Sequence, residues 1–213
     1  MRSAIDRLDT DAIADAIQAI GFECTDCGAC CRGDDESPHT ATVFPSEARR
    51  LAEPDDAWRD VVRPMPYGLD DDGTGVTLEW AIQTTSCGDC RFLEQADGDS
   101  HCTRYASRPS ICRTYPFTLR ASPEAPPQGD AVDAEGPVIA HECEGLGRDI
   151  DRDRAEALAE ELLERAMTSL DEATAVRGHL RRDDVDADGA VVIDSEGPKR
   201  PDGTAVTGPE TQR

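Results

Sequence analysis

The spacing of apolar residues predicts a helix close to the start of the chain. The apolar positions that recur at helical spacing are Ala12, Ile13, Ala16, Ile17 and Ile20. Asp9 and Thr10 are suitable caps at its beginning, and Gly21 ends the pattern. We therefore predict that residues 1–21 form an N-terminal helix ahead of the main domain.

A longer helix is predicted over residues 151–176. Apolar side chains at helical spacing share one of its faces, and acidic residues and arginines occupy the other. The apolar positions are Leu158, Leu162, Ala166 and Leu170. This pattern is typical of a helix that packs one side on a core and exposes the other to solvent.

Strands are predicted where apolar and polar residues alternate. The alternating apolar positions are Val76, Leu78, Trp80 and Ile82. Short extended segments are also predicted at 42–44, before a helix over 46–52 capped by Ser46, and at 138–140, after a Pro- and Gly-rich loop over 121–137. Together with the two helices, these elements predict a small, loop-rich α+β fold.

We assign residues 22–182 to one cysteine-rich domain with a metal centre at its core, closed by the long helix. Residues 183–213 are acidic and poor in apolar side chains, so we expect a largely disordered tail. Within that tail, Ala190–Ile193 is apolar enough to form a short edge strand.

The chain carries a formal charge of −23, with 45 acidic residues against 22 basic ones, of which only Lys199 is a lysine. Such a surface is typical of halophilic proteins, because hydrated carboxylates keep a protein soluble in concentrated salt. The same charge repels phosphates and argues against nucleic-acid binding. No apolar stretch approaches the length of a membrane span. We expect a cytoplasmic protein with no membrane partner, from a halophilic archaeon.

The cysteines predict metal binding. Eight of the nine fall in two clusters and the last follows later: Cys24, Cys27, Cys30 and Cys31, then Cys87, Cys90, Cys102 and Cys112, and finally Cys143. Thiolates two residues apart can face one soft metal ion. Disulfides are the alternative, but the count is odd, residues 1–20 contain no apolar signal segment, and cytosolic thiols stay reduced. We keep one form of that alternative, a single redox-switching pair.

Three motifs place the cysteines in a specific setting. They are Phe22-x-Cys24-x2-Cys27-Gly28-x-Cys30-Cys31-Arg32, Cys87-x2-Cys90-x-Phe92-Leu93 and Cys102-x2-Tyr105-x2-Arg108-Pro109-x2-Cys112-Arg113-x-Tyr115-Pro116-Phe117. In order and spacing they resemble the CxxCxxCC cysteine-cluster proteins, also called the YkgJ family. The resemblance covers residues 22–145 and implies a zinc- or iron-chelating domain. Flagellin lysine N-methylases share this kind of cluster, so a metal-dependent protein-modifying enzyme is an implied alternative.

Coordination chemistry favours an iron–sulfur cluster of the [4Fe–4S] type. Cys24, Cys27 and Cys30 form the C-x2-C-x2-C run that holds such clusters in bacterial ferredoxins, with a fourth thiolate from elsewhere in the chain. Separate C-x2-C pairs are equally typical of tetrathiolate zinc, so a structural or storage zinc protein is the alternative. All nine cysteines are candidate ligands.

How the cysteines divide between centres stays open at this point. Neighbouring side chains of an extended backbone point to opposite sides, so Cys30 and Cys31 more easily serve two centres than one. Eight thiolates can make two four-cysteine sites, in which Cys143 can replace any ligand. His101 and His141 are further candidate ligands, with a polar loop role as their alternative.

Arg32, Arg113 and Tyr115 are candidates for contact with a bound centre. A thiolate-rich centre is negatively charged, so nearby guanidinium groups lower its energy, and a tyrosine hydroxyl can donate to sulfur. Surface ion pairing is the alternative for the two arginines, and ring packing is the alternative for the tyrosine.

Overall fold

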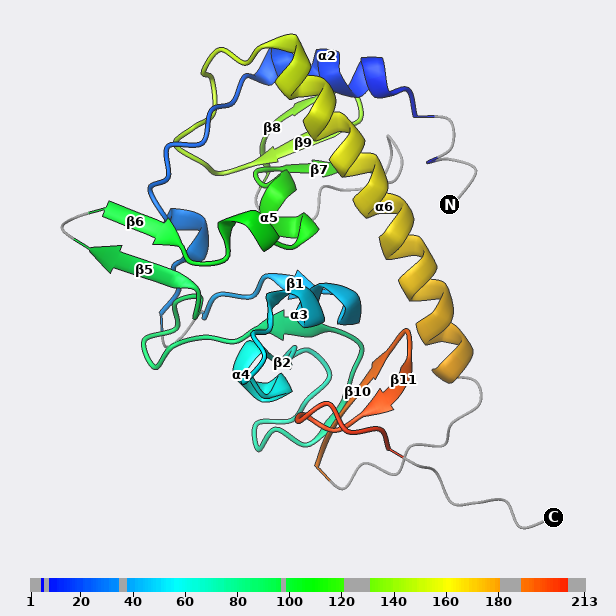
Figure 1. The fold of residues 1–213 in the computed structure, drawn as a ribbon. Helices are drawn as coiled ribbons and strands as arrows, with labels where there is room; N and C mark the ends of the chain where they lie inside the picture. The colour runs from blue at the N-terminus through cyan, green and yellow to red at the C-terminus, as the bar shows by residue number, and fades with distance from the viewer. Residues whose placement is uncertain are drawn as a thin grey trace. The chain divides into compact units, whose positions relative to one another are not determined.

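The computed structural model describes residues 5, 8–34, 38–96, 99–120, 131–180 and 189–206, and it confirms the α+β class with one long helix toward the C-terminus (Figure 1). The helices are α2 (Thr10–Ile20), α3 (Pro45–Leu51), α4 (Trp58–Val61), α5 (Ser110–Thr114) and α6 (Arg152–Leu180), with 3-10 turns η1 (Ala29–Cys31) and η2 (Tyr105–Ser107). The strands are β1 (Thr42–Val43), β2 (Val62–Pro64), β3 (Gly75–Thr77), β4 (Trp80–Ile82), β5 (Leu93–Ala96), β6 (Asp99–Cys102), β7 (Phe117–Leu119), β8 (Ala131–Glu135), β9 (Val138–His141), β10 (Ala190–Asp194) and β11 (Gly197–Lys199).

The chain divides into two compact units, each described here by itself. Unit 1 comprises Met1–Cys30, Glu94–Cys102 and Ser110–Leu170, and unit 2 comprises Cys31–Leu93, Thr103–Pro109 and Asp171–Arg213. The division falls between the adjacent residues Cys30 and Cys31. The domain boundaries that we placed at residues 21 and 182 stay predictions.

The core of unit 1 forms where α2, the first turns of α6 and the sheet β7-β9-β8 pack together. Ile13, Ile17 and Leu158 have no exposed surface. Phe22 and Phe117 meet edge to face, with ring centroids 5.5 Å apart. Since Phe22 belongs to this core, the chain is anchored two residues before the first cysteine.

Both predicted helices are present. In α2, the carboxylate of Asp9 accepts a hydrogen bond from Asp11 N at 3.2 Å, and the helix ends at Gly21 with φ 76°. Residues 1–4 and 6–7 of the predicted helix lie outside the described residues. The long helix continues past residue 176 to Leu180 and includes Gly178, since a single glycine costs a helix only about 1 kcal/mol.

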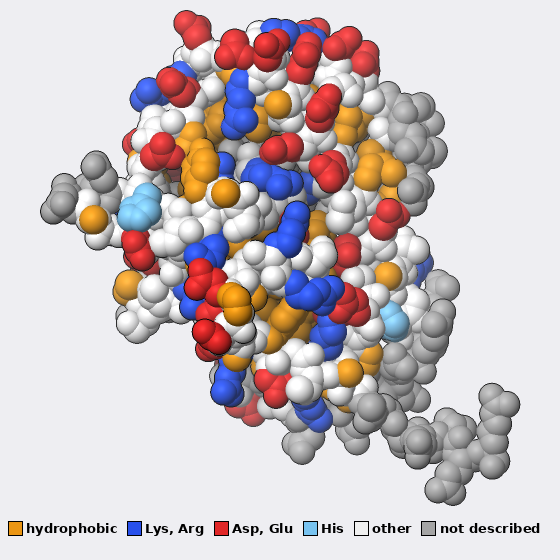
Figure 2. All heavy atoms as spheres, viewed as in Figure 1, with side chains coloured by type: hydrophobic (Ala, Val, Ile, Leu, Met, Phe, Trp, Pro, Cys, Tyr) orange, Lys and Arg blue, Asp and Glu red, His pale blue; other side chains and the backbone are white. Residues whose placement is uncertain are grey.

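Charged side chains bridge α2 and α6 on the surface of unit 1. Arg152 Nη2 lies 3.0 Å from Asp11 Oδ1, its Nε lies 2.6 Å from Glu156 Oε1, and it also pairs with Asp15. Figure 2 shows acidic side chains gathered over this end of the molecule. Part of the acidic excess is therefore balanced by one arginine that three carboxylates share.

In unit 2, the predicted strand over residues 76–82 is two strands in two different sheets, which corrects our prediction. β3 lies in the sheet β11-β10-β3 and β4 is the central strand of β1-β4-β2. The alternation fails at Leu78, which is 44% exposed, whereas Trp80 is fully buried. A bend at Leu78 redirects the chain from one set of partners to the other.

Two smaller predictions also change. The helix expected from Ser46 begins at Pro45, and Phe44 takes the capping position, where its N–H donates to Glu47 Oε2 at 3.1 Å. A proline at the first helical position loses nothing, because that N–H has no partner within the helix. The predicted loop over 121–137 contains β8, whose five residues are exposed, and residues 121–130 lie outside the described residues.

The predicted disordered tail is wrong for residues 190–199. β10 is the central strand of its sheet, parallel to β3 and antiparallel to β11, and not an edge strand. Val191 and Val192 have no exposed surface and Ile193 has 2%. A short apolar run among charged residues does not show which distant strands it pairs with. Composition alone therefore led us to predict disorder here. Residues 181–188 and 207–213 lie outside the described part.

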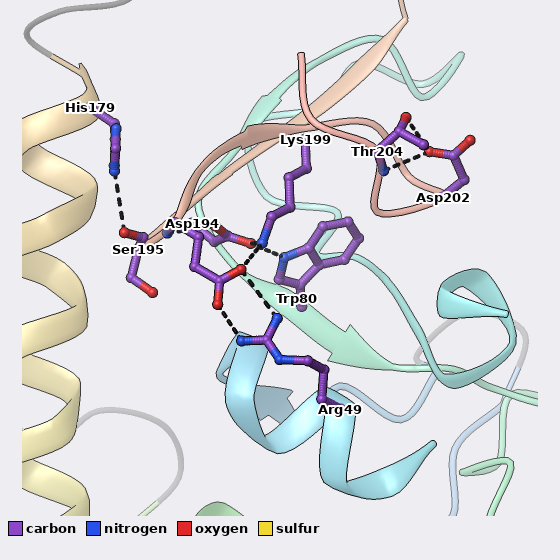
Figure 3. A network of polar contacts seen from close by, with 9 residues as sticks. Arg49, Trp80, His179, Asp194, Ser195, Lys199, Asp202 and Thr204 are labelled. Carbon is purple, nitrogen blue, oxygen red and sulfur yellow. Dashed lines mark hydrogen bonds and ion pairs between the residues drawn. The ribbon is translucent and has the colours of Figure 1, made fainter. Parts of the chain in front are cut away.

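A polar network with Asp194 and Lys199 buried at its centre fixes this segment within unit 2 (Figure 3). Asp194 Oδ2 accepts hydrogen bonds from Trp80 Nε1 at 2.9 Å and from Lys199 Nζ at 2.7 Å. Lys199 also donates to Glu196 at 2.7 Å, and the Glu196 carboxylate pairs with Arg49 of α3. The network ties the β10–β11 hairpin to β4 and α3.

Candidate metal centre

In unit 1, Cys24 and Cys27 lie on a short loop that follows α2, and Cys30 lies in the turn η1 at the end of that loop. Cys24 and Cys30 are exposed and Cys27 is partly buried. The loop turns sharply, with left-handed backbone at Asp26, φ 53°, and at Gly28, φ 72°. Cys24 Sγ donates to the carboxylate of Asp26 at 3.6 Å. The turn presents the three thiols on an open loop.

The segment that follows β9 lies alongside this loop. Glu23 N donates to Gly145 O at 3.0 Å, and Gly147 N donates to Gly21 O at 3.0 Å. Between these bonds, Phe22 forms an antiparallel bridge with Leu146. The ninth cysteine, Cys143, lies on this segment. The sequence alone does not predict which of the other cysteines it accompanies.

The thiols of unit 1 influence one another electrostatically. Burial is the largest cause that raises the pKa of Cys143, and negative charge at Cys27 and Cys30 raises it further, against a hydrogen bond from Gly145 N. The pKa of Cys24 is also raised, first by burial and in part by charge at Cys30. A bound cation would act in the opposite direction, because positive charge favours the thiolate.

Tyr115 lies beside the same group of thiols. Burial raises the pKa of Tyr115 to about 12, and negative charge at Cys143 and Cys30 adds to that effect. Its hydroxyl donates to the backbone oxygen of Glu142. The structure therefore places the predicted ring near the cysteines, while its O–H serves a carbonyl of the segment that carries Cys143.

The two predicted arginines are carried on different elements. Arg113 lies on α5, with its Nε 3.7 Å from Glu161 Oε2 on α6, while Arg32 directly follows η1. Cys112 shares α5 with Arg113, and Cys102 ends β6; both of these cysteines are partly buried.

The candidate histidines have other polar neighbours. His101 Nε2 lies 3.2 Å from Glu94 Oε2, and His141 Nε2 lies 3.1 Å from Thr118 Oγ1. Both histidines make polar contacts, but they lie in strands, His101 in β6 and His141 at the end of β9, so the loop position that we gave as the alternative is wrong.

Unit 2 holds its own three cysteines on paired backbone. Cys90 N donates to Cys31 O at 2.8 Å, and Cys87 lies across a tight turn from Cys90. Cys87 Sγ donates to one carboxylate oxygen of Asp89 at 3.8 Å, and the other oxygen accepts from Gly33 N at 2.9 Å. This second group is therefore organised around the C-x2-C turn.

No disulfide joins any of the nine cysteines, all of which are described. Among the described residues, no three metal-ligating side chains already converge on one point as they would around an ion. What the structure provides is two groups of cysteine-bearing backbone, whose side chains would have to turn toward a metal.

A comparison with protein families finds a match to the cysteine-bearing part of the sequence. Residues 23–144 match the family model CxxCxxCC, "Putative zinc- or iron-chelating domain", over more than half of the chain. The chain belongs to the CxxCxxCC family. No curated protein and no solved structure matches it.

Membership in the CxxCxxCC family supports metal binding in general and names zinc and iron together. The matched span contains all nine cysteines, from Cys24 to Cys143. Separately, no helix among the described residues is both long and apolar enough to cross a membrane.

Proposed function

We propose that the chain binds an iron–sulfur cluster and that Cys24, Cys27 and Cys30 supply three of its thiolates. The observation that carries this proposal is the C-x2-C-x2-C run on one sharply turning segment, in which Cys24 and Cys30 are exposed and Cys27 is partly buried. The same spacing holds the iron atoms of [4Fe–4S] clusters in bacterial ferredoxins. The family description, which includes iron, supports the proposal.

The donor set fits a soft metal centre. Thiols are the dominant potential ligands around the loop, and thiolates are the ligands that iron–sulfur clusters and zinc prefer. Burial raises the pKa of Cys24, so metal binding would release protons as the thiols become thiolates. A bound cluster would supply one-electron transfer, and a reducing cytoplasm would keep the thiols available for it.

Arg32, Arg113 and Tyr115 are proposed to set the surroundings of the centre. Tyr115 has the strongest support, because burial and, after it, negative charge at Cys143, Cys30 and Cys27 raise its pKa. Its ring would exclude water from one side of the centre. The guanidinium groups of the two arginines would offset the negative charge of the thiolates.

Zinc is the second candidate, and the cysteines of unit 2 favour it. A C-x2-C turn is the usual half of a tetrathiolate zinc site, and the backbone pairing of Cys90 with Cys31 adds a third thiol to Cys87 and Cys90. Cys102 and Cys112 stay in the set of proposed ligands, and we assign neither of them to one of the two groups. Such a zinc ion would stabilise the fold and need take no part in chemistry.

The metal itself tests this proposal. Protein produced without oxygen in a host that builds clusters should be brown and contain iron and acid-labile sulfide in similar amounts. Cys27→Ser should remove the colour, because a serine oxygen is a poor ligand for this centre. Thr25→Ser, in the same loop, is the control and should keep it. Colourless wild-type protein with stoichiometric zinc and no sulfide would replace the cluster with the zinc alternative.

A further inference from the structure

We propose that Cys143 supplies the fourth thiolate of the centre built on Cys24, Cys27 and Cys30. The inference rests on the proposed function and deepens it, since it names the remote residue that completes the coordination sphere. A C-x2-C-x2-C run supplies three of the four thiolates of a [4Fe–4S] cluster, so the fourth comes from elsewhere in the chain. Five other cysteines compete for that position.

Backbone pairing carries the argument. The bonds from Glu23 N to Gly145 O and from Gly147 N to Gly21 O, both 3.0 Å, run on either side of the Phe22–Leu146 bridge. In this antiparallel register the chain ahead of residue 145 continues beside the chain that follows residue 23. Cys143 therefore lies on the segment that runs antiparallel to the start of the cysteine loop.

Two glycines make the approach close. A Cβ at Gly145 would lie 2.2 Å from Glu23 O, and one at Gly21 would lie 2.5 Å from Arg148 O. Neither distance is compatible with a side chain, so both positions require glycine where the segments meet. The contact is thus built into the backbone and does not depend on rotatable surface side chains.

Contacts beyond the backbone extend the pairing toward the cysteines. Thr25 Oγ1 donates to the carboxylate of Glu144, which links the residue after Cys24 to the residue after Cys143. Gly145 N donates to Cys143 Sγ at 3.4 Å. Amide hydrogen bonds to sulfur are typical of iron–sulfur centres, whose reduction potential they adjust.

The competing cysteines of unit 2 have a different setting. Cys31 and Cys90 pair with each other through their backbones, and Cys87 lies on the same turn as Cys90. In unit 1, Cys143 instead lies on the segment whose backbone pairs with residues 21–23, directly before the cysteine loop. Backbone pairing therefore associates Cys143 with the loop of Cys24, Cys27 and Cys30. It associates Cys31 with Cys87 and Cys90.

Differential alkylation of the wild-type protein tests this assignment without altering the fold. The anaerobically loaded protein and the same protein stripped by a chelator are treated with iodoacetamide, and each cysteine is quantified by mass spectrometry. We expect loading to slow the labelling of Cys143 at least about tenfold, in parallel with Cys24, Cys27 and Cys30, because ligation blocks a thiol as nucleophile. Equal labelling of Cys143 in both samples, with the other three protected, would overturn the inference.

Variants give a second measurement. Cys143→Ser should lose iron and sulfide as fully as Cys27→Ser, whereas Glu142→Gln, one exposed residue away, should retain both. Gly145→Ala keeps every thiol but cannot keep the contact with Glu23, so it should also lose iron. Circular dichroism identifies variants that fail to fold, and alkylation of the wild type then decides. A cluster that survives in Cys143→Ser overturns this inference alone, while wild-type protein without iron overturns the proposed function.

Discussion

Lys199, the single lysine of the chain, is a buried structural residue. Its Nζ lies 2.7 Å from Asp194 Oδ2 and 2.7 Å from Glu196 Oε2, and 11% of its side chain is exposed. Composition predicted a surface poor in lysine, but it could not show that the remaining lysine is paired in the interior. That pairing depends on the β10–β11 hairpin, which brings both carboxylates to one amine.

The Glu196 carboxylate should make stability depend on pH. Its hydrogen bond with Arg49, with a further contribution from Lys199, lowers the pKa of Glu196 from 4.5 to about 2. Because the folded value lies below the unfolded one, the stabilisation is complete above pH 4.5 and is lost as the pH falls toward 2. Glu196→Gln removes this contribution.

We therefore expect the melting temperature of Glu196→Gln to lie below that of the wild type at pH 6. The difference should shrink as the pH is lowered to 3. Glu135→Gln, on the exposed strand β8, controls for the loss of one carboxylate. A difference between wild type and Glu196→Gln that stays constant from pH 6 to pH 3 would contradict the role given to this ion pair.

At the scale of elements, the predictable parts are those whose pattern is local. The periods of α2 and α6, and the cap at Asp9, lie within a few turns of each helix, so the sequence predicts both. β3 instead pairs with β10, far along the chain, and no local pattern identifies that partner. The same holds for the site. The spacing of Cys24, Cys27 and Cys30 is local and predicts that they group together, whereas the position of Cys143 depends on backbone pairing between distant segments.

Truncation tests the structural role of the last hairpin. Ending the chain after Asp194 removes β11 and Lys199 and leaves the buried Asp194 carboxylate without its cation. We expect a loss of about 3–5 kcal/mol in the free energy of unfolding, measured by urea denaturation. Ending it after Val206 keeps the described contacts and should leave stability unchanged. Equal stability of both truncations would show that the hairpin contributes nothing.

The charge of −23 belongs to the whole molecule, and local ion pairs do not remove it. Arg152 shares its guanidinium among three carboxylates, yet acidic residues outnumber basic ones 45 to 22. Repulsion among the surplus carboxylates opposes compact folding and is screened within about 3 Å in molar salt. The net charge follows from composition alone, because it does not depend on the fold.

Potassium chloride should therefore stabilise the protein. We expect both the helical circular-dichroism signal and the melting temperature to rise as the salt is increased from dilute buffer into the molar range. Sucrose, which stabilises folded proteins without screening charge, measures the size of a solvent effect unrelated to charge. Identical melting curves in dilute and molar salt would argue against the halophilic interpretation.

The pairing of residues 21–23 with residues 145–147 also bears on how the chain folds. A metal held by both Cys30 and Cys143 would close a loop of about 110 residues, and closing a loop of that length removes about 4–5 kcal/mol of freedom from the unfolded chain. The centre would act as a crosslink comparable with a disulfide. Without it, the two segments must find each other by diffusion of the intervening chain, which is slow for distant contacts. The rate at which the protein matures would then follow the supply of its metal.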